Sequence, residues 1–252
     1  MNKFIFSILC RVRHFILLYN RNKYKDKISY YDGNFPDYDK VILNNNDIIR
    51  EIIYKDSRWN HIKYIGQFMW NDMFKFRLFQ YRNTIIDNIC EDLYIKREHS
   101  SIKCEIPCKH KNEWIFLQIP NKLKTYEFSF DAIIKTVNTE FQIAFNFENI
   151  GRRYRFNLVN NQRINFDIVE NGMFYNSLIS VPFALKLDEL YHFKLKVNKN
   201  KFQYIINDDV VMSVQINVKE LLKGDIILIL WNSEAKPINV IYKNLNLKTV
   251  TR

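Results

Sequence analysis

The sequence contains little glycine, proline or cysteine. Only 5 Gly and 5 Pro occur in 252 residues, so most turns must be formed by Asn and Asp, which tolerate left-handed backbone and close their own turns. The 4 Cys are too few for a disulfide scaffold at this length, and we expect reduced thiols. A chain of this size buries a substantial core without such cross-links, as one large domain or two small ones.

Four patterns that would indicate a membrane span, a phosphate site or a metal site are also missing. No apolar run reaches the ~18 residues of a membrane-spanning helix, and no glycine-rich loop that would hold a phosphate occurs. The five histidines show no paired spacing. Cys104, Cys108 and His110 lack the second pair of ligands that is usual in a zinc site. We therefore expect no metal and no cofactor.

The net charge of +11 is concentrated near the start of the chain. Residues 1–30 contain seven basic residues against Asp26 alone, and the other 222 residues carry only +5, with both signs mixed. A mixed surface of this kind is more typical of solvated protein than of a track for phosphates. We therefore expect no nucleic-acid partner.

Residues 3–21 have the period of an amphipathic helix with a basic polar face. Together with the basic run that follows, this pattern is typical of a helix lying in the plane of an anionic membrane. The membrane contacts would come from Phe4, Ile8, Val12, Phe15, Arg11 and Arg13. The same pattern also suits a helix that packs on the rest of the chain or on a partner, and this alternative stays open. Because no secretory signal is visible, we expect a cytoplasmic protein, with residues 1–27 at the inner face of the membrane.

From residue 113 onward the hydrophobic period is two. In residues 126–135, for example, Tyr126, Phe128 and Phe130 alternate with Glu127 and Ser129. Many such segments, separated by Asn- and Asp-containing turns at spacings of ~8–12 residues, predict a mainly β antiparallel sandwich. The high aromatic fraction of 15% agrees with this. The predicted strands cover residues 113–119, 126–135, 141–147, 153–158, 164–168, 173–181, 190–197, 202–206, 210–216, 225–231 and 238–247.

Residues 28–85 show no clean period. Residues 44–47 (Asn-Asn-Asn-Asp) would cap a short helix over residues 48–54. We expect short helices and irregular structure that pack on the sandwich rather than form an independent domain.

The later strands resemble those of concanavalin-like (laminin-G-like) jelly rolls. The residues that carry the likeness lie at 190–197, 201–207, 210–214, 224–231 and 238–247. Asp208 stands where the family usually has Gly after the hairpin Asn, and Tyr191 stands where it usually has Trp. The resemblance covers residues 86–252 and implies a jelly-roll sandwich with a glycan or protein ligand.

No catalytic residue is assigned. The β-glucanases of this fold carry Glu-x-Asp-x-x-Glu on one strand, and this chain lacks that motif. Glu127 and Asp131 share a strand face, but they are ~13 Å apart, which exceeds the spacing of either class of glycosidase carboxylate pair. Carboxylates from different strands would be needed, and the candidates are Glu140, Glu148, Asp167 and Glu170.

The candidate sugar-binding residues are grouped around one predicted strand. Sugar sites in sandwiches combine planar hydrogen-bonding side chains with an aromatic platform. Arg153, Arg155 and Asn157 share one face of a strand, and Asn146 and Gln142 lie across a turn from them. Trp231 or Tyr175 would supply the platform, and the arginines would also suit an acidic glycan. An ordinary polar outer face explains the same residues.

Three functions therefore stay open. The leading hypothesis is a non-catalytic, lectin-like glycan-binding module of a bacterial protein, peripheral to the membrane and linked to surface-polysaccharide assembly. The second is a glycan-active enzyme whose carboxylates come from different strands. The third is a protein-interaction sandwich without a sugar site. The oligomeric state stays open in all three.

Overall fold

The computed structural model describes residues 24, 26–43, 50–55, 94–98, 101–107, 113–136, 140–149, 152–170, 173–232 and 236–251. Within these ranges, the side chains of residues 43, 50–55, 94, 113–114, 149, 173–176 and 232 are outside the description. The predicted helix over residues 3–21, with its membrane contacts, lies outside the described residues as well. Over the described ranges, no helix has the length and apolarity needed to cross a bilayer.

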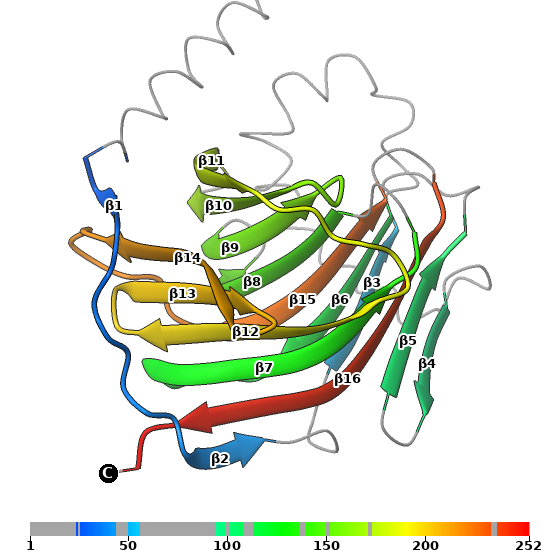
Figure 1. Ribbon diagram of the computed structural model, residues 1–252, viewed down its shortest axis with the longest axis horizontal. Helices are drawn as coiled ribbons and strands as arrows, with labels where there is room; N and C mark the ends of the chain where they lie inside the picture. The colour runs from blue at the N-terminus through cyan, green and yellow to red at the C-terminus, as the bar shows by residue number, and fades with distance from the viewer. Residues whose placement is uncertain are drawn as a thin grey trace, which may run out of the picture.

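The described strands form two antiparallel sheets that face each other (Figure 1). In spatial order, sheet A contains β1 (Ile28–Tyr30), β14 (Asp209–Ile216), β13 (Lys201–Ile206), β12 (Leu190–Asn198), β7 (Thr125–Ile134), β16 (Ile238–Thr249), β5 (Ser101–Ile106) and β4 (Tyr94–Glu98), and β2 (Lys40–Leu43) also pairs with β16. Sheet B contains β11 (Met173–Pro182), β10 (Arg163–Glu170), β9 (Arg152–Val159), β8 (Glu140–Asn149), β15 (Asp225–Asn232), β6 (Glu113–Ile119) and β3 (Arg50–Lys55). The mainly β sandwich class and the strands predicted from residue 113 onward are confirmed.

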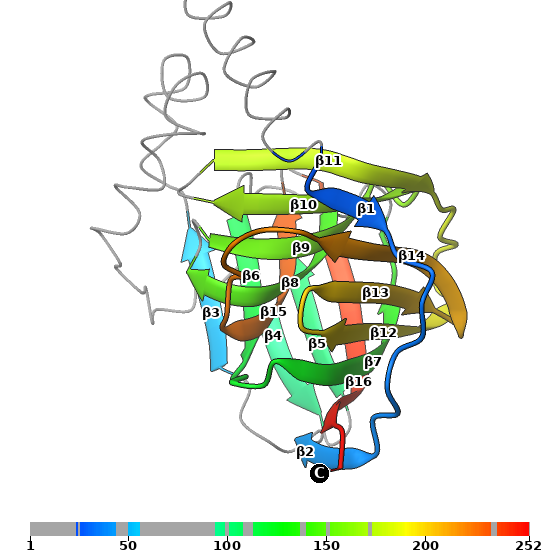
Figure 2. The ribbon, with the colours of Figure 1, turned by 90° about the vertical axis from the view of Figure 1, so that its left-hand side faces the viewer.

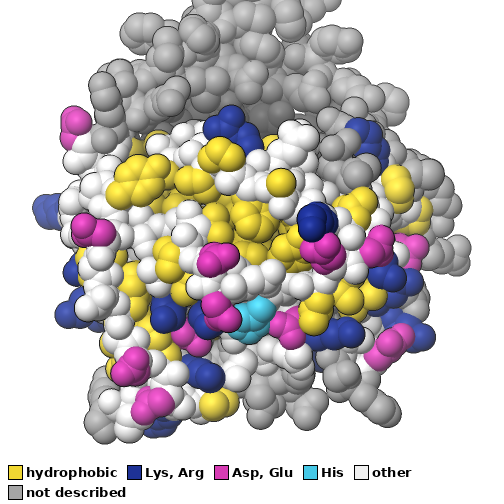
Figure 3. Space-filling view, viewed as in Figure 1, with side chains coloured by type: hydrophobic (Ala, Val, Ile, Leu, Met, Phe, Trp, Pro, Cys, Tyr) yellow, Lys and Arg dark blue, Asp and Glu magenta, His cyan; other side chains and the backbone are white. Residues whose placement is uncertain are grey.

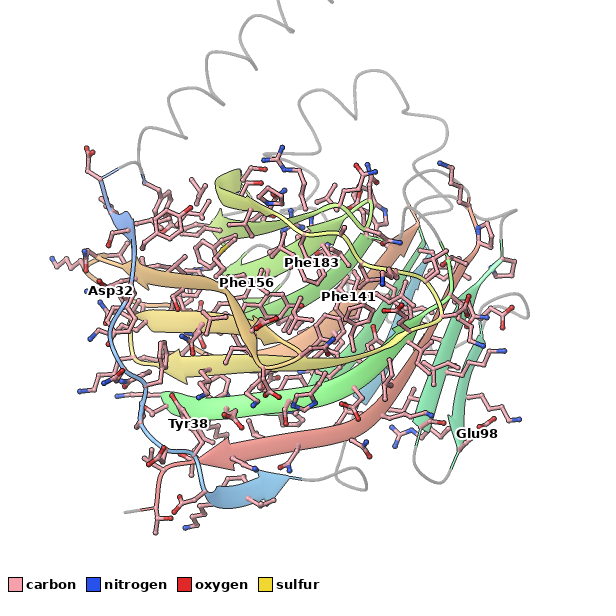
Figure 4. The ribbon with its side chains drawn as sticks, viewed as in Figure 1. Asp32, Tyr38, Glu98, Phe141, Phe156 and Phe183 are labelled. Atoms are coloured by element: carbon pink, nitrogen blue, oxygen red, sulfur yellow. The ribbon has the colours of Figure 1, made fainter. Side chains whose placement is uncertain are left out.

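Alternation places one face of each long strand between the sheets, where aromatic rings dominate the core. Figure 4 shows Phe141 and Phe156 in this interior. Phe156 of sheet B stacks on Tyr204 of sheet A with ring centroids 4.9 Å apart, and Phe141 lies 5.2 Å from Phe193. Such ring pairs contribute about 0.5–1.5 kcal/mol each beyond the area they bury. The period of two and the high aromatic content therefore together account for the aromatic core between the sheets.

Residues 28–30, 40–43 and 50–55 form strands of the sandwich, which corrects the prediction of short helices and irregular structure there. β1 pairs with β14, β2 with β16, and β3 with β6. The helix predicted over residues 48–54 is wrong, because residues 50–55 form the edge strand of sheet B. A helix this short gains little by itself, whereas pairing with β6 satisfies the backbone of residues that include two β-branched isoleucines. Residues 56–85 lie outside the description.

The chain between β1 and β2 crosses the ends of the central strands of sheet A (Figures 1 and 2). The Tyr38 hydroxyl donates a hydrogen bond to the carbonyl oxygen of Val197 in β12 over 3.1 Å. Burial raises the pKa of Tyr38 well above its usual value. The Lys201 ammonium lies 4.3 Å from the centre of the Tyr31 ring, a cation–π contact. This segment therefore ties β12 and β13 together at one end of the sandwich.

Asparagine and aspartate supply the left-handed backbone that glycine usually provides. Asn207 and Asp208, between β13 and β14, have φ values of 50° and 67°, and two consecutive positive values define a type I′ hairpin turn. Asp208 therefore adopts the conformation for which the resembled family uses Gly.

Candidate functional site

The outer face of sheet A carries partly exposed charges that pair across strands. On β7, Glu127 is opposite Lys196 and Lys248, and Asp131 is opposite His192. His192 Nδ1 lies 2.7 Å from Asp131 Oδ1, and the His192 side chain is 40% exposed. Figure 3 shows acidic and basic side chains interspersed on this face. The face has the character of a partly solvated ladder of ion pairs.

The outer face of sheet B differs because the polar side chains at its centre are buried. On β8, β9 and β10 the inward positions are Phe, Ile, Leu and Tyr, and the outward positions include amides and charges. These outward polar side chains are 0–6% exposed, and they are Gln142, Asn157, Arg153, Arg155 and Asp167. Buried charges and amides need partners within the protein, so the contacts of these five residues decide what the face can do.

A buried ion pair lies at the centre of this face. The Arg155 Nε donates to Asp167 Oδ2 over 2.8 Å, and the two side chains are 7% and 1% exposed. The Arg155 Nη1 donates to Gln142 Oε1 over 3.0 Å, and the backbone N–H of Ser177 donates to Asp167 Oδ1. A register shift after Phe166 and a φ of 51° at Ser177 bring that N–H to the carboxylate. The positive charge of Arg155 is thus balanced by Asp167 inside the face.

A row of amides runs across three strands beside this pair. Gln142 of β8 is opposite Asn157 of β9, which is opposite Asn165 of β10, and we refer to these three residues as the amide row. At its far end the Ser180 hydroxyl donates to Asn165 Oδ1 over 2.6 Å. Asn165 and Ser180 are partly exposed, so the row runs from the interior of the face to its rim.

Two atoms of the amide row are buried without a hydrogen bond. Because Arg155 can only donate, the oxygen of Gln142 must face it, which leaves Gln142 Nε2 as a donor. Across the described residues, neither Gln142 Nε2 nor Asn157 Oδ1 has a partner. An unfilled buried polar group costs about 1–3 kcal/mol. The two residues are directly opposite in the register, so the donor and the acceptor that lack partners belong to neighbouring side chains.

Three more of the predicted site residues, Arg153, Trp231 and Tyr175, also belong to strands of sheet B. Arg153 is on the same face as Arg155, is 1% exposed and is opposite Val169; it has contacts of its own. Trp231 is on this face too, opposite Glu140, and it is partly exposed. Counted across the register, Trp231 is a diagonal neighbour of Gln142. The backbone of Tyr175 pairs with Ile168 in sheet B, and its side chain is outside the description.

Asn146 lies away from the other candidates. Its φ of 48° and the register shifts of β8 against β9 and β15 turn its side chain out of the alternation. Its Nδ2 donates to the Leu222 carbonyl oxygen over 2.9 Å, and its Oδ1 accepts from the Tyr126 hydroxyl over 3.3 Å. Tyr126 is fully buried in the core. A strict period of two would place Asn146 with Gln142, and a single left-handed residue removes it from that face.

Sequence reasoning missed the roles of Asp167, Asn165 and Ser180. Asp167 was considered only as one carboxylate of an enzyme. The turn at residues 160–162 makes Val159 opposite Arg163, and that register brings Asp167 opposite Arg155. Counting back from the turn Asn160-Asn161 would therefore have found the ion pair.

The other chemical candidates are placed elsewhere. Cys104 is fully buried in β5 and faces the core, and Cys108 and His110 lie outside the description. Over the part of the chain that is described, no three His, Cys, Asp or Glu side chains are grouped as a metal ion requires. Burial raises the pKa of the Tyr154 hydroxyl to about 12, although that hydroxyl accepts a hydrogen bond from the backbone N–H of Leu222. This hydroxyl belongs to the core and not to a reactive group.

Comparison with known proteins yields neither a matching family model nor a matching curated sequence. Several solved structures are similar. The carbohydrate-binding module CBM66 from Bacillus subtilis shares 14% identity and a TM-score of 0.49, over 62% of this chain and 92% of that one. The exoplasmic/lumenal domain of VIP36, in its Ca2+/Man3GlcNAc-bound form, shares 8% identity and a TM-score of 0.48, over 64% and 85%. The alginate lyase Aly36B shares 14% identity and a TM-score of 0.44, over 62% and 83%.

Proposed function

We propose that this chain is a non-catalytic glycan-binding module whose ligand hydroxyls bind to the amide row on the outer face of sheet B. The observation that carries the proposal is the buried, unfilled pair of Gln142 Nε2 and Asn157 Oδ1. A sugar hydroxyl both accepts and donates a hydrogen bond. One hydroxyl between these two atoms would satisfy both of them and recover the cost of leaving them unfilled.

The surroundings of the amide row support this use. Arg155 holds Gln142 through a 3.0 Å hydrogen bond, so the amide is oriented before a ligand arrives. Trp231 is partly exposed beside the row, and an indole ring provides the flat surface on which sugar rings stack. At the other end, Asn165 and Ser180 offer polar groups at the rim. The arrangement of an aromatic surface at one end and hydrogen-bonding groups along a line suits an extended glycan.

Ligand entry requires a local rearrangement, because the two unfilled atoms are closed to solvent. The binding-competent state is then a minor state of the free protein, and its population scales the apparent affinity. We expect association to be slower than for an open site.

A binding function is favoured over catalysis by the state of the carboxylate at the centre of the face. Both oxygens of Asp167 accept hydrogen bonds, from Arg155 and from the backbone of Ser177. A carboxylate that is 1% exposed and has both oxygens engaged by protein donors is poorly placed to exchange a proton with a ligand. Asp167 therefore orients its neighbours rather than reacting.

The membrane and pathway parts of the hypothesis rest on the sequence pattern alone. The basic helix predicted over residues 3–21 would hold the module on an anionic membrane, where it would serve surface-polysaccharide assembly. Flotation of the full chain with vesicles containing anionic lipid tests the first step. The variant Arg11→Glu/Arg13→Glu should lose flotation, and equal flotation of both proteins would refute the membrane contact.

The glycan proposal is tested on a glycan array with the full chain and two variants. Asn157→Leu keeps the approximate side-chain volume and removes an acceptor that has no partner, so it should fold as well as the wild type. It should lose at least tenfold in glycan binding. Gln215→Leu is the matched control, because Gln215 bonds to Asn217 on the outer face of sheet A, and it should bind as the wild type does.

Two results would overturn the proposal. The first is a folded wild-type protein that binds no glycan on the array. The second is an Asn157→Leu variant that binds with unchanged affinity. Thermal melting of each variant before the array shows that any loss of binding does not come from unfolding.

A further inference from the structure

We infer that Asp167 determines the charge of the ligand, so that the site takes neutral, hydroxyl-rich glycans and rejects those with carboxylate or sulfate groups. This inference rests on the proposed function and narrows it. The sequence left acidic glycans open because two arginines share a strand face. The contacts of those arginines close that possibility.

The guanidinium of Arg155 already has an anion. Its Nε donates to Asp167 Oδ2 over 2.8 Å, and its Nη1 donates to Gln142 Oε1 over 3.0 Å. Recognition of an acidic sugar by arginine uses parallel N–H groups aimed at the two ligand oxygens. Here the Nε edge is occupied by a carboxylate that is 1% exposed. An entering anion would therefore meet an ion pair with no net charge and would be repelled by the Asp167 carboxylate. This repulsion is strong because the buried surroundings screen charge weakly.

Arg153 does not supply the missing positive charge. It is 1% exposed and is engaged in contacts of its own. Along β9 the outward-facing residues are Arg153, Arg155 and Asn157 in that order, so Arg153 lies further from the amide row than Arg155 does. The amide row is therefore flanked by a balanced ion pair, and the nearest guanidinium is not available to a ligand.

The unfilled atoms of the row also select against anions. Asn157 Oδ1 is an acceptor without a partner, and it needs a group that carries hydrogen. A hydroxyl brings one, whereas an ionised carboxylate or sulfate has only lone pairs and would place them against the amide oxygen. A site can reject a ligand by placing two hydrogen-bond acceptors against each other, which is an effective means of specificity. The ion pair and the amide row thus favour the same class of ligand.

A substitution of Asp167 can remove its charge and still keep the hydrogen bond that it accepts. Its Oδ1 accepts from the Ser177 N–H at the irregular position of β11. Asn in place of Asp keeps an oxygen for that N–H and nearly the same volume. The variant Asp167→Asn therefore removes the negative charge, retains the acceptor and leaves the charge of Arg155 unbalanced.

The experiment measures the ligand preference of the full chain with matched pairs of oligosaccharides. Each pair differs only at C6 (hexose against hexuronic acid), as galactotriose does from trigalacturonic acid, and a sulfated galactotriose is added. Wild type should bind the neutral members at least tenfold more tightly than the acidic ones. Asp167→Asn should shift this ratio at least tenfold toward the acidic members, because the unbalanced guanidinium then gains an anion. Glu127→Gln on the outer face of sheet A is the charge-matched control and should leave the ratio unchanged.

A second variant serves if Asp167→Asn fails to fold. Arg155→Gln/Asp167→Asn replaces both charges by amides and leaves no uncompensated charge. It should bind the neutral glycans and discriminate less strongly against the acidic ones, because the fixed carboxylate is gone. Discrimination as strong as that of the wild type would overturn the role of Asp167.

The outcomes separate this inference from the proposed function. A wild type that binds acidic members preferentially refutes the charge selection and leaves glycan binding in place. The same applies if folded Asp167→Asn shows the wild-type ratio. A folded wild type that binds no member of either kind refutes the proposed function, and the inference fails with it.

Discussion

The outer faces of the two sheets use the same strand period but treat polar side chains in opposite ways. On sheet A the charges are partly exposed and alternate across β12, β7 and β16, as in Lys196 opposite Glu127, whose side chains are 25% and 12% exposed. At the centre of sheet B's outer face the polar side chains are buried, and Arg155 and Asp167 form an ion pair that is 7% and 1% exposed. An exposed pair contributes about 0–1 kcal/mol, whereas breaking a buried pair on one side costs about 3–5 kcal/mol. The comparison shows that burial, and not residue type, decides how much a polar side chain contributes to the free energy of unfolding.

Ionisation of the tyrosines buried between the two sheets, at alkaline pH, should give the largest loss of folding stability. Burial raises the pKa of Tyr126, Tyr204 and Tyr242 of sheet A and of Tyr154 of sheet B. A raised pKa means that folding stability is fully present below pH ~10, the value for an unfolded tyrosine, and falls as the pH rises through the folded pKa. Between the unfolded and the folded pKa, the four tyrosines together should cost up to about 6 kcal/mol for each pH unit, at about 1.4 kcal/mol each.

Urea unfolding at pH 7, 10 and 11 measures this loss. A single transition that moves to lower urea would show that the sheets unfold together. Two separate transitions would mean that the two faces belong to independent units, which would break the comparison. Constant stability up to pH 11 would contradict the burial of these hydroxyls.

Matched substitutions on the two faces test the comparison itself. Arg155→Met should lower the free energy of unfolding by about 3–5 kcal/mol, because it leaves the Asp167 charge buried and uncompensated. Lys196→Met removes the 3.9 Å contact with Glu127 on sheet A and should cost less than about 1 kcal/mol. Urea unfolding at pH 7 gives both values. Equal losses would show that the two faces are energetically alike.

Asp131 should give a smaller effect than Arg155, although its short contacts on sheet A resemble those of the buried ion pair on sheet B. Its Oδ1 lies 2.7 Å from His192 Nδ1, its Oδ2 accepts from Asn244 Nδ2 over 2.6 Å, and its side chain is 14% exposed. Asp131→Asn keeps the shape and should cost about 1 kcal/mol, as expected for one weakened hydrogen bond. A loss as large as that of Arg155→Met in the same urea experiment would place a second buried-type cluster on the exposed face.

The strands from residue 113 onward were predictable because they are long and alternate clearly. The edge strand β3 was not, since the asparagines before it resemble a helix cap and only its pairing with β6 selects the strand. The same contrast applies to the candidate site. Gln142, Arg155 and Asn157 were predicted to share a face because parity alone places them there. Asn146 was misplaced, because parity cannot detect a left-handed residue within a strand.

The sequence by itself determined the sandwich class and the side chains that share a face of each strand, since alternation follows from the local geometry of the backbone. Only the tertiary structure decided that Arg155 meets Asp167, and that Gln142 and Asn157 lie side by side with unfilled hydrogen-bonding atoms. The register of one strand against another depends on turn length and bulges. Burial depends on which parts of the chain meet in space, and on the outer face of sheet B burial converted an ordinary polar pattern into a selective one.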